Sequence, residues 1–254
     1  ALPIENGPFY GSYSNLEVIS DPGTNFVNWT TSGQEDNWGI FRVAYYDLGS
    51  LLGNLILPSG QPWTYTDGDA GKELTGIFYG IDIVDFNPNS TALNAIGGHL
   101  DIYLNDFGTL NMSTALASQR TGTSTFTGIT DGELWLSLDF VPQTSGYTVM
   151  GTNTLSTIPP AGDSNTYYNV VGGSQMAIFN NDYYDAIAPG ADLLGQNSFY
   201  AFLDNAGAPS PVNGWTHYST DPVTGYATPE PTTMLLLGLG LLGIAGVSRR
   251  KKNA

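Results

Sequence analysis

The sequence contains no cysteine among its 254 residues, so disulfide bonds, thiolate catalysis and cysteine-based zinc sites are excluded. Histidine is nearly as scarce. Only His99 and His217 occur, and neither has a catalytic or metal-binding partner at a suitable spacing. The many serines include no Gly-x-Ser-x-Gly motif. The absence of these residues and of this motif predicts that the chain has no catalytic residues.

Positive charge is also scarce. Seven Lys and Arg stand against 23 Asp and Glu, and charged residues make up 12% of the chain, about half of the roughly 25% usual in globular domains. Four of the bases are consecutive: Arg249, Arg250, Lys251 and Lys252. Without the residues from Pro229 onward, which hold those four bases and one acid, 22 acids face three bases, a formal charge of −19. Such a charge repels phosphates, so we expect no nucleic-acid partner, and it attracts divalent cations.

Strands are favoured over helices throughout the body of the chain. With 32 Gly and 15 Pro, chain breaks are too frequent for long helices. Apolar and polar residues alternate in HLDIYLND (99–106), GELWLSLDFV (132–141) and NSFYAFLDN (197–205), as they do in half-buried strands. In the second of these segments, Trp135 falls on the face opposite Leu136.

Many short strands separated by Gly, Pro, Asn and Asp turns are typical of an all-β fold. We predict an antiparallel β-sandwich, jelly-roll-like, with helix plausible only at 110–119 and 182–188. The sandwich would occupy residues 1–212, and Pro-rich segments would form a linker over 213–228. Residues 229–254 would form a separate C-terminal tail.

The tail has the length and the flanking charge of a single transmembrane helix. Met234–Val247 is fourteen apolar or glycine residues, and flanking Thr and Ser extend it to seventeen, about 25 Å as a helix and near the minimum that spans a hydrocarbon core. The basic cluster after it marks the cytoplasmic side, which would place residues 1–228 on the far side of the membrane. Gly240, Gly243 and Gly246 share one face where a partner helix could approach, although such glycines are also ordinary in membrane helices.

Pro229, Glu230 and Pro231 precede this segment, so a Pro-Glu-Pro box, a Gly/Leu-rich segment and a basic cluster follow in order. The arrangement resembles the PEP-CTERM sorting signal over roughly the last tenth of the chain. The resemblance implies export by a Gram-negative bacterium, recognition by an exosortase, which is a membrane-embedded transpeptidase-like enzyme, and processing near the box. The prolines keep the box extended and open to a protease. An uncleaved single-pass anchor is the alternative.

The resemblance also implies a location. We expect transient anchoring in the inner membrane, followed by placement at the cell surface or in the extracellular matrix. The family is associated with exopolysaccharide, biofilm and floc formation. Ala1 as the first residue is consistent with removal of a signal peptide.

Calcium is the one cofactor that the sequence brings into consideration. The segment TDGDAGKE, residues 66–73, spaces Asp67, Asp69 and Glu73 like the start of a calcium loop. The EF-hand template fails at three of its positions, however, and a polar hairpin turn is the alternative interpretation.

Tryptophans in polar contexts suggest glycan contact. The candidates are Trp38, Trp63, Trp135 and Trp215. Aromatic rings flanked by Asn and Asp suit sugar rings, which present C–H faces and hydroxyls together. The alternative is that these rings fill the core.

These observations predict an exported protein with a structural or adhesive role in exopolysaccharide, biofilm or floc. A carbohydrate-binding module that recognises a specific glycan is the alternative, and an extracellular glycan-active enzyme is third. The expected partners are an exosortase, the membrane before processing, and exopolysaccharide.

Overall fold

The computed structural model describes residues 7–19, 35–48, 65–86, 92–153, 161–207 and 210–227. The described strands form one ten-stranded sheet and one two-stranded sheet. The large sheet contains β1 (Gly7–Ile19), β2 (Asn37–Leu48), β3 (Tyr65–Thr66), β4 (Lys72–Phe86), β5 (Ala92–Asp106), β8 (Glu133–Val141), β9 (Val149–Asn153), β10 (Ala161–Gly172), β11 (Leu193–Ala201) and β12 (His217–Ala227). The remaining elements are β6 (Arg120–Gly122), β7 (Thr125–Phe126), η1 (Asp69–Gly71), η2 (Ala117–Gln119) and α1 (Met176–Phe179).

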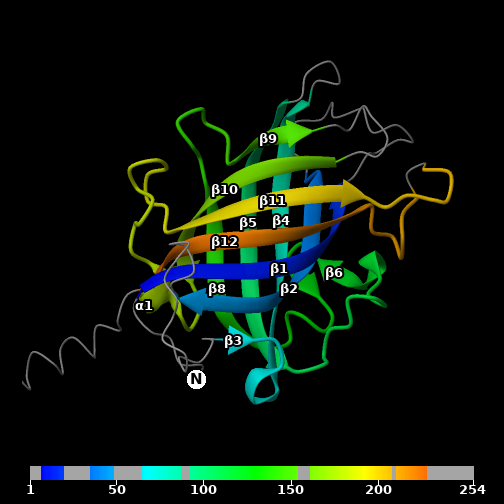
Figure 1. Ribbon diagram of the computed structural model, residues 1–254, viewed down its shortest axis with the longest axis horizontal. Coiled ribbons are helices and arrows are strands. Elements are labelled where there is room, and N and C mark those ends of the chain that lie inside the picture. The colour runs from blue at the N-terminus through cyan, green and yellow to red at the C-terminus, as the bar shows by residue number, and fades with distance from the viewer. Residues whose placement is uncertain are drawn as a thin grey trace, which may run out of the picture.

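The large sheet closes on itself because β1 pairs antiparallel with both β12 and β2. Around the closed sheet the order is β1, β2, β4, β5, β8, β10, β11 and β12, so each barrel strand lies beside the barrel strands that precede and follow it in sequence. Figure 1 shows β10, β11, β12 and β1 crossing in front of β4 and β5. The result is an up-and-down barrel.

One position of the barrel is shared by two short strands. Both β8 and β9 pair antiparallel with β5 on one side and with β10 on the other. Residues 142–148 connect β8 to β9 outside the ladder, and the chain rejoins the ladder at β9. The pair therefore acts as a single interrupted strand, and the barrel has eight strand positions.

The all-β, antiparallel part of the prediction is confirmed, but the strands form one closed sheet rather than the two packed sheets of a sandwich. Both architectures bury one face of every strand, so the same alternation fits either one. Segment 213–228, expected to be a linker, contains β12, which pairs with β1 and β11 and closes the barrel. Segments 110–119 and 182–188, where helix was plausible, hold turns, with the three-residue η2 in the first.

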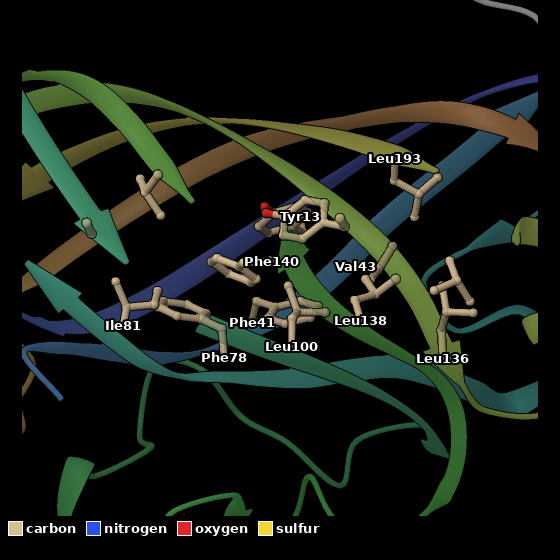
Figure 2. Close-up of a cluster of buried hydrophobic side chains, with 14 of the residues drawn as sticks. Tyr13, Phe41, Val43, Phe78, Ile81, Leu100, Leu136, Leu138, Phe140 and Leu193 are labelled. Atoms are coloured by element: carbon tan, nitrogen blue, oxygen red, sulfur yellow. The ribbon is translucent and has the colours of Figure 1, made fainter. Parts of the chain in front are cut away.

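Inward-facing side chains fill the barrel with an apolar cluster. Tyr13 of β1, Phe41 of β2, Phe78 of β4, Leu100 of β5 and Phe140 of β8 all belong to it. Figure 2 shows these side chains meeting in the space that the strands enclose. An eight-stranded barrel is just wide enough for its own side chains, so the interior forms a packed core.

Trp135 departs from the predicted alternation. The ladder between β5 and β8 skips this residue, because Ile102 pairs with Leu136 and Tyr103 with Leu134. An extra residue of this kind forms a β-bulge, which changes the direction of its side chain. The indole that the sequence placed on the opposite face therefore packs into the barrel core beside α1 and is only 4% exposed.

A second apolar cluster lies on the outer side of the barrel wall. Ile40 of β2 and Ile77 of β4 point outward and pack against Phe126 and Ile129 from the long β5–β8 connection, together with Trp215. The Trp215 Nε1–H donates to the carbonyl of residue 115 in the same connection, at 2.9 Å. The connection thus covers part of the barrel instead of projecting from it.

Gly76 of β4 allows the neighbouring groups inside the barrel to approach closely. A Cβ atom there would clash with the Phe41 ring and would lie 2.6 Å from the carbonyl oxygen of Asp101.

We expect Gly76→Ala to lower the free energy of unfolding by about 1–3 kcal/mol in urea denaturation, because an overpacked core must shift. Gly172→Ala is the matched control, because its Cβ would meet the Ser137 Cβ at an ordinary 3.4 Å. Equal losses in the two variants would contradict the packing explanation.

Candidate functional site

The predicted sorting residues lie outside the described residues: Pro229, Glu230, Pro231, Gly240, Gly243, Gly246, Arg249, Arg250, Lys251 and Lys252. The predicted membrane helix, residues 234–247, also lies outside them. Within the described ranges, no helix is long and apolar enough to cross a membrane. The last described strand, β12, ends at Ala227, two positions before the Pro-Glu-Pro box in the sequence. The box therefore follows closely on the strand that completes the barrel.

Arg42 engages two of the three carboxylates of the predicted calcium loop. Its Nη2 atom lies 2.7 Å from Asp67 Oδ2 and 3.2 Å from Glu73 Oε2. Glu73 is fully buried and also accepts two backbone N–H groups of the β5–β8 connection, at 2.7 and 3.0 Å. Asp69 is exposed on η1. Within the part of the chain that the structure describes, no group of three or more His, Asp and Glu is arranged to hold a metal ion.

Three of the four tryptophans predicted to contact glycans are described, and they pack against other side chains. Trp135 and Trp215 are 4% and 1% exposed, so neither ring offers a face to a sugar. Trp38 is partly buried, with its ring centroid 5.2 Å from that of Trp215 and the Arg120 guanidinium 4.3 Å above it. Trp63 lies outside the described residues. The alternative interpretation, that large rings fill cores, therefore describes Trp135 and Trp215.

Two tyrosines form an exposed aromatic pair on the outer surface of β11 and β12. Tyr200 and Tyr218 are direct cross-strand partners, and their rings stack with centroids 5.7 Å apart and planes 29° apart. They are 44% and 43% exposed. The Phe202 ring lies 5.1 Å from that of Tyr218 and extends the pair. We call Tyr200, Phe202 and Tyr218 the aromatic face.

Polar side chains continue the same outer surface across β9, β10 and β11. They border a shallow depression and include Thr152, Asp163, Asn165, Gln196 and Ser198. Ser198 Oγ donates to Asp163 Oδ1 at 2.7 Å. Because side chains two residues apart in a strand share one face, Ser198 and Tyr200 point to the same side. We call the five residues the polar row.

The aromatic face and the polar row offer complementary contacts to one ligand. Exposed rings provide flat apolar surface, and hydroxyl, amide and carboxylate groups can donate or accept hydrogen bonds. The alternation over 197–205 correctly placed Phe199 and Ala201 inside, where both are buried, whereas Leu203, which it also placed inside, is 36% exposed. The same alternation puts Tyr200 and Phe202 on the outer face, so the sequence did indicate part of the aromatic face. The prediction of glycan contact named only tryptophans and therefore did not include it.

A second polar constellation joins side chains of β4, β5 and β8. His99 and Asp139 are cross-strand partners, as are Asp101 and Ser137. His99 Nδ1 lies 2.6 Å from Asp139 Oδ1, and its Nε2 lies 3.0 Å from both Asp101 Oδ1 and Ser137 Oγ. The Tyr79 hydroxyl donates to Asp101 Oδ2 at 3.1 Å. In the sequence His99 lies apart from most of these partners, because Ser137 and Asp139 belong to another strand.

These Ser, His and Asp contacts do not activate Ser137 as a nucleophile. The Ser137 hydroxyl donates to Asp101 Oδ1 at 2.7 Å, so its proton is directed away from the histidine. Hydrogen bonding to Asp101, and then to Asp139, raises the pKa of the His99 imidazole although burial opposes this. A more basic imidazole is protonated over a wider range of pH, and in that form it cannot accept the serine proton, as nucleophilic catalysis requires. The constellation is a structural network of charges and hydrogen bonds.

The raised pKa of His99 predicts how this network depends on pH. Its stabilisation is fully present below the unfolded pKa of about 6.5 and is lost as the pH rises through the higher folded pKa. We therefore expect His99→Gln to cost about 1–3 kcal/mol in urea denaturation at pH 6, as for hydrogen bonds to charged groups, and less at pH 9. Asp139→Asn, which removes only the charge of the more exposed partner, should cost less than His99→Gln. A penalty for His99→Gln that is the same at both pH values would show that the imidazole is not charged.

Comparison with known proteins bears on the tail. A family model described as the PEP-CTERM protein-sorting motif matches residues 227–251. No curated protein and no solved structure matches the chain. The family match confirms the resemblance in the tail and includes only Ala227 of the barrel.

Proposed function

Because its PEP-CTERM sorting motif marks this chain as an exported protein that an exosortase sorts, we propose that the barrel has a structural or adhesive role outside the cell. The membrane holds the chain by its tail during sorting. The processed barrel then resides at the cell surface or in a matrix of exopolysaccharide, biofilm or floc. The observation that carries this proposal is the motif itself, placed directly after the last strand.

Two features of the barrel are compatible with a role outside the cell. Each of its eight strand positions is paired on both sides, so no strand position of the described barrel is an edge strand of the kind that promotes aggregation. The fold also needs no disulfide, because no cysteine is present. Cleavage at the Pro-Glu-Pro box would leave every described strand in the released part.

Processing can be measured as the intact mass of the protein recovered from its native cells. We expect the mature chain to end before Thr232, because the box is the recognition element and the helix is removed. A variant with Pro229, Glu230 and Pro231 all changed to Ala should keep the full tail and stay in the membrane fraction. A full-length mass for the wild-type protein in the extracellular fraction would contradict sorting by cleavage and favour a permanent anchor.

A carbohydrate-binding role is the second candidate, and the aromatic face with its polar row favours it. The two exposed rings are held by cross-strand pairing and lie beside groups that can hydrogen-bond hydroxyls. A face of this kind would let the barrel hold exopolysaccharide directly. A glycan-active enzyme stays the third candidate, and we assign no residue to it.

Retention on exopolysaccharide from the native cells tests the carbohydrate-binding candidate. We expect Tyr200→Ala and Tyr218→Ala each to weaken binding at least ~10-fold, which corresponds to losing a contact of ~1.4 kcal/mol. Tyr183→Ala is the matched control, because Tyr183 is 53% exposed on a segment outside the aromatic face. If the Tyr200→Ala and Tyr218→Ala variants are retained as strongly as the wild type, the carbohydrate-binding candidate is excluded and the structural role is left.

A further inference from the structure

A cluster of polar side chains from β1, β2 and β11 lies within the otherwise apolar interior of the barrel. Glu17 and Asn15 of β1, Asn37 of β2 and Asn197 of β11 line a cavity of about 50 Å³ inside the barrel. The Glu17 side chain is completely buried. Apolar side chains of the core form much of the remaining wall. A cavity of this size holds a water-sized or ion-sized occupant and excludes a sugar.

The hydrogen bonds around Glu17 are unevenly divided between its two carboxylate oxygens. Oε1 accepts from Asn15 Nδ2 at 2.9 Å, from Ser219 Oγ at 2.8 Å and from Asn197 Nδ2 at 3.5 Å. Oε2 has no hydrogen-bond partner, although it is buried. The amide of Asn37 also interacts with this carboxyl.

Two further buried oxygens, on residues that line the same cavity, have no hydrogen-bond partner. They are Asn37 Oδ1 and Asn197 Oδ1, each bonded to the same carbon as an amide nitrogen near Glu17. Turning the Asn197 amide over would remove the N–H that it donates to the carboxylate. Burial raises the pKa of the Glu17 carboxyl. In its ionised form all three unpartnered atoms are acceptors, so what they lack is a hydrogen-bond donor or a cation.

No basic side chain of the described barrel neutralises Glu17. The three bases that precede the tail form ion pairs elsewhere: Arg42 with Asp67 and Glu73, Lys72 with Asp106, and Arg120 with Glu35. His217 is the cross-strand partner of Glu17, but burial lowers its pKa from 6.5 to about 4, so it is neutral at neutral pH. A buried carboxylate without a counter-charge is unfavourable.

We propose that Glu17 Oε2, Asn37 Oδ1 and Asn197 Oδ1 coordinate one hard cation, Ca²⁺ or Na⁺, inside the barrel. Carboxylate and amide oxygens are the ligands that such cations prefer. The hydroxyls of Ser164 and Thr166 line the same cavity and supply further oxygens. The strongly negative charge of the body raises the local concentration of cations around the barrel.

The barrel wall has an interruption beside this site. The ladder between β11 and β12 has no pairs between Gly195–Val223 and Phe199–Ser219. Asn197 lies within that interruption and borders both the interior cavity and the depression of the polar row. A residue that contributes a ligand oxygen therefore also borders the outer surface, where an ion would enter.

Thermal unfolding of the purified full-length protein tests this inference, which does not depend on the proposed function. The protein is first treated with a chelator in choline chloride, and CaCl₂ or NaCl is then added at constant ionic strength. We expect one of the two cations to raise Tm by roughly 5–10 °C at about 100-fold excess over its Kd. Glu17→Gln keeps the size of the side chain but removes its charge, and it should abolish the shift.

Two variants separate this site from cation binding elsewhere. Glu133→Gln removes an exposed carboxylate of β8 and should respond to the cation as the wild type does. Asn37→Asp adds a second carboxylate to the site and should tighten Ca²⁺ binding at least ~10-fold in titration calorimetry. A Tm that neither cation raises above the choline control would overturn the inference. So would a Glu17→Gln variant that responds like the wild type, because the ion would then lie on the acidic surface.

Discussion

The double pairing of β1 is the constraint on which the rest of the structure depends. This strand joins β2, its neighbour in sequence, to β12, which ends at Ala227 immediately before the sorting tail. The barrel can therefore close only after nearly the whole body of the chain is available. Contacts that span such a separation form slowly, because the entropy of a long loop must be lost first. Closure also brings Glu17 of β1 opposite His217 of β12, so the interior polar group exists only in the closed state.

Much of the strand content was predictable from the sequence, but the closure was not. The alternation over 99–106, 132–141 and 197–205 correctly located parts of β5, β8 and β11, because a strand with one buried face requires it. Alternation does not specify which strands pair, so a sandwich and a barrel look alike at this level. Pro-rich segments predict a linker over 213–228, whereas the pairing of β12 with two neighbours makes most of that range a strand. Local propensity was overridden there by tertiary contacts.

The candidate sites show the same division between local and non-local information. The outward direction of Tyr200 follows from its own strand, but its stacking on Tyr218 requires the register between β11 and β12. The His99 network likewise depends on the register between β5 and β8, which the sequence alone does not fix. For Trp135 the prediction failed within a strand whose position was predicted correctly. A single β-bulge reversed the direction of its side chain, and the alternation of the sequence does not reveal the bulge.

The interior of the barrel raises the question of why it is not wholly apolar. An eight-stranded barrel is filled by its own side chains, and an apolar residue at position 17 would avoid the cost of burying a carboxyl, which is several kcal/mol for an unpaired charge. Three asparagines converge on Glu17, and packing alone requires none of them. Places where a sequence departs from the simplest stable solution are those where function is expected. The sorting tail determines where the protein goes, whereas the group around Glu17 belongs to the barrel that remains there.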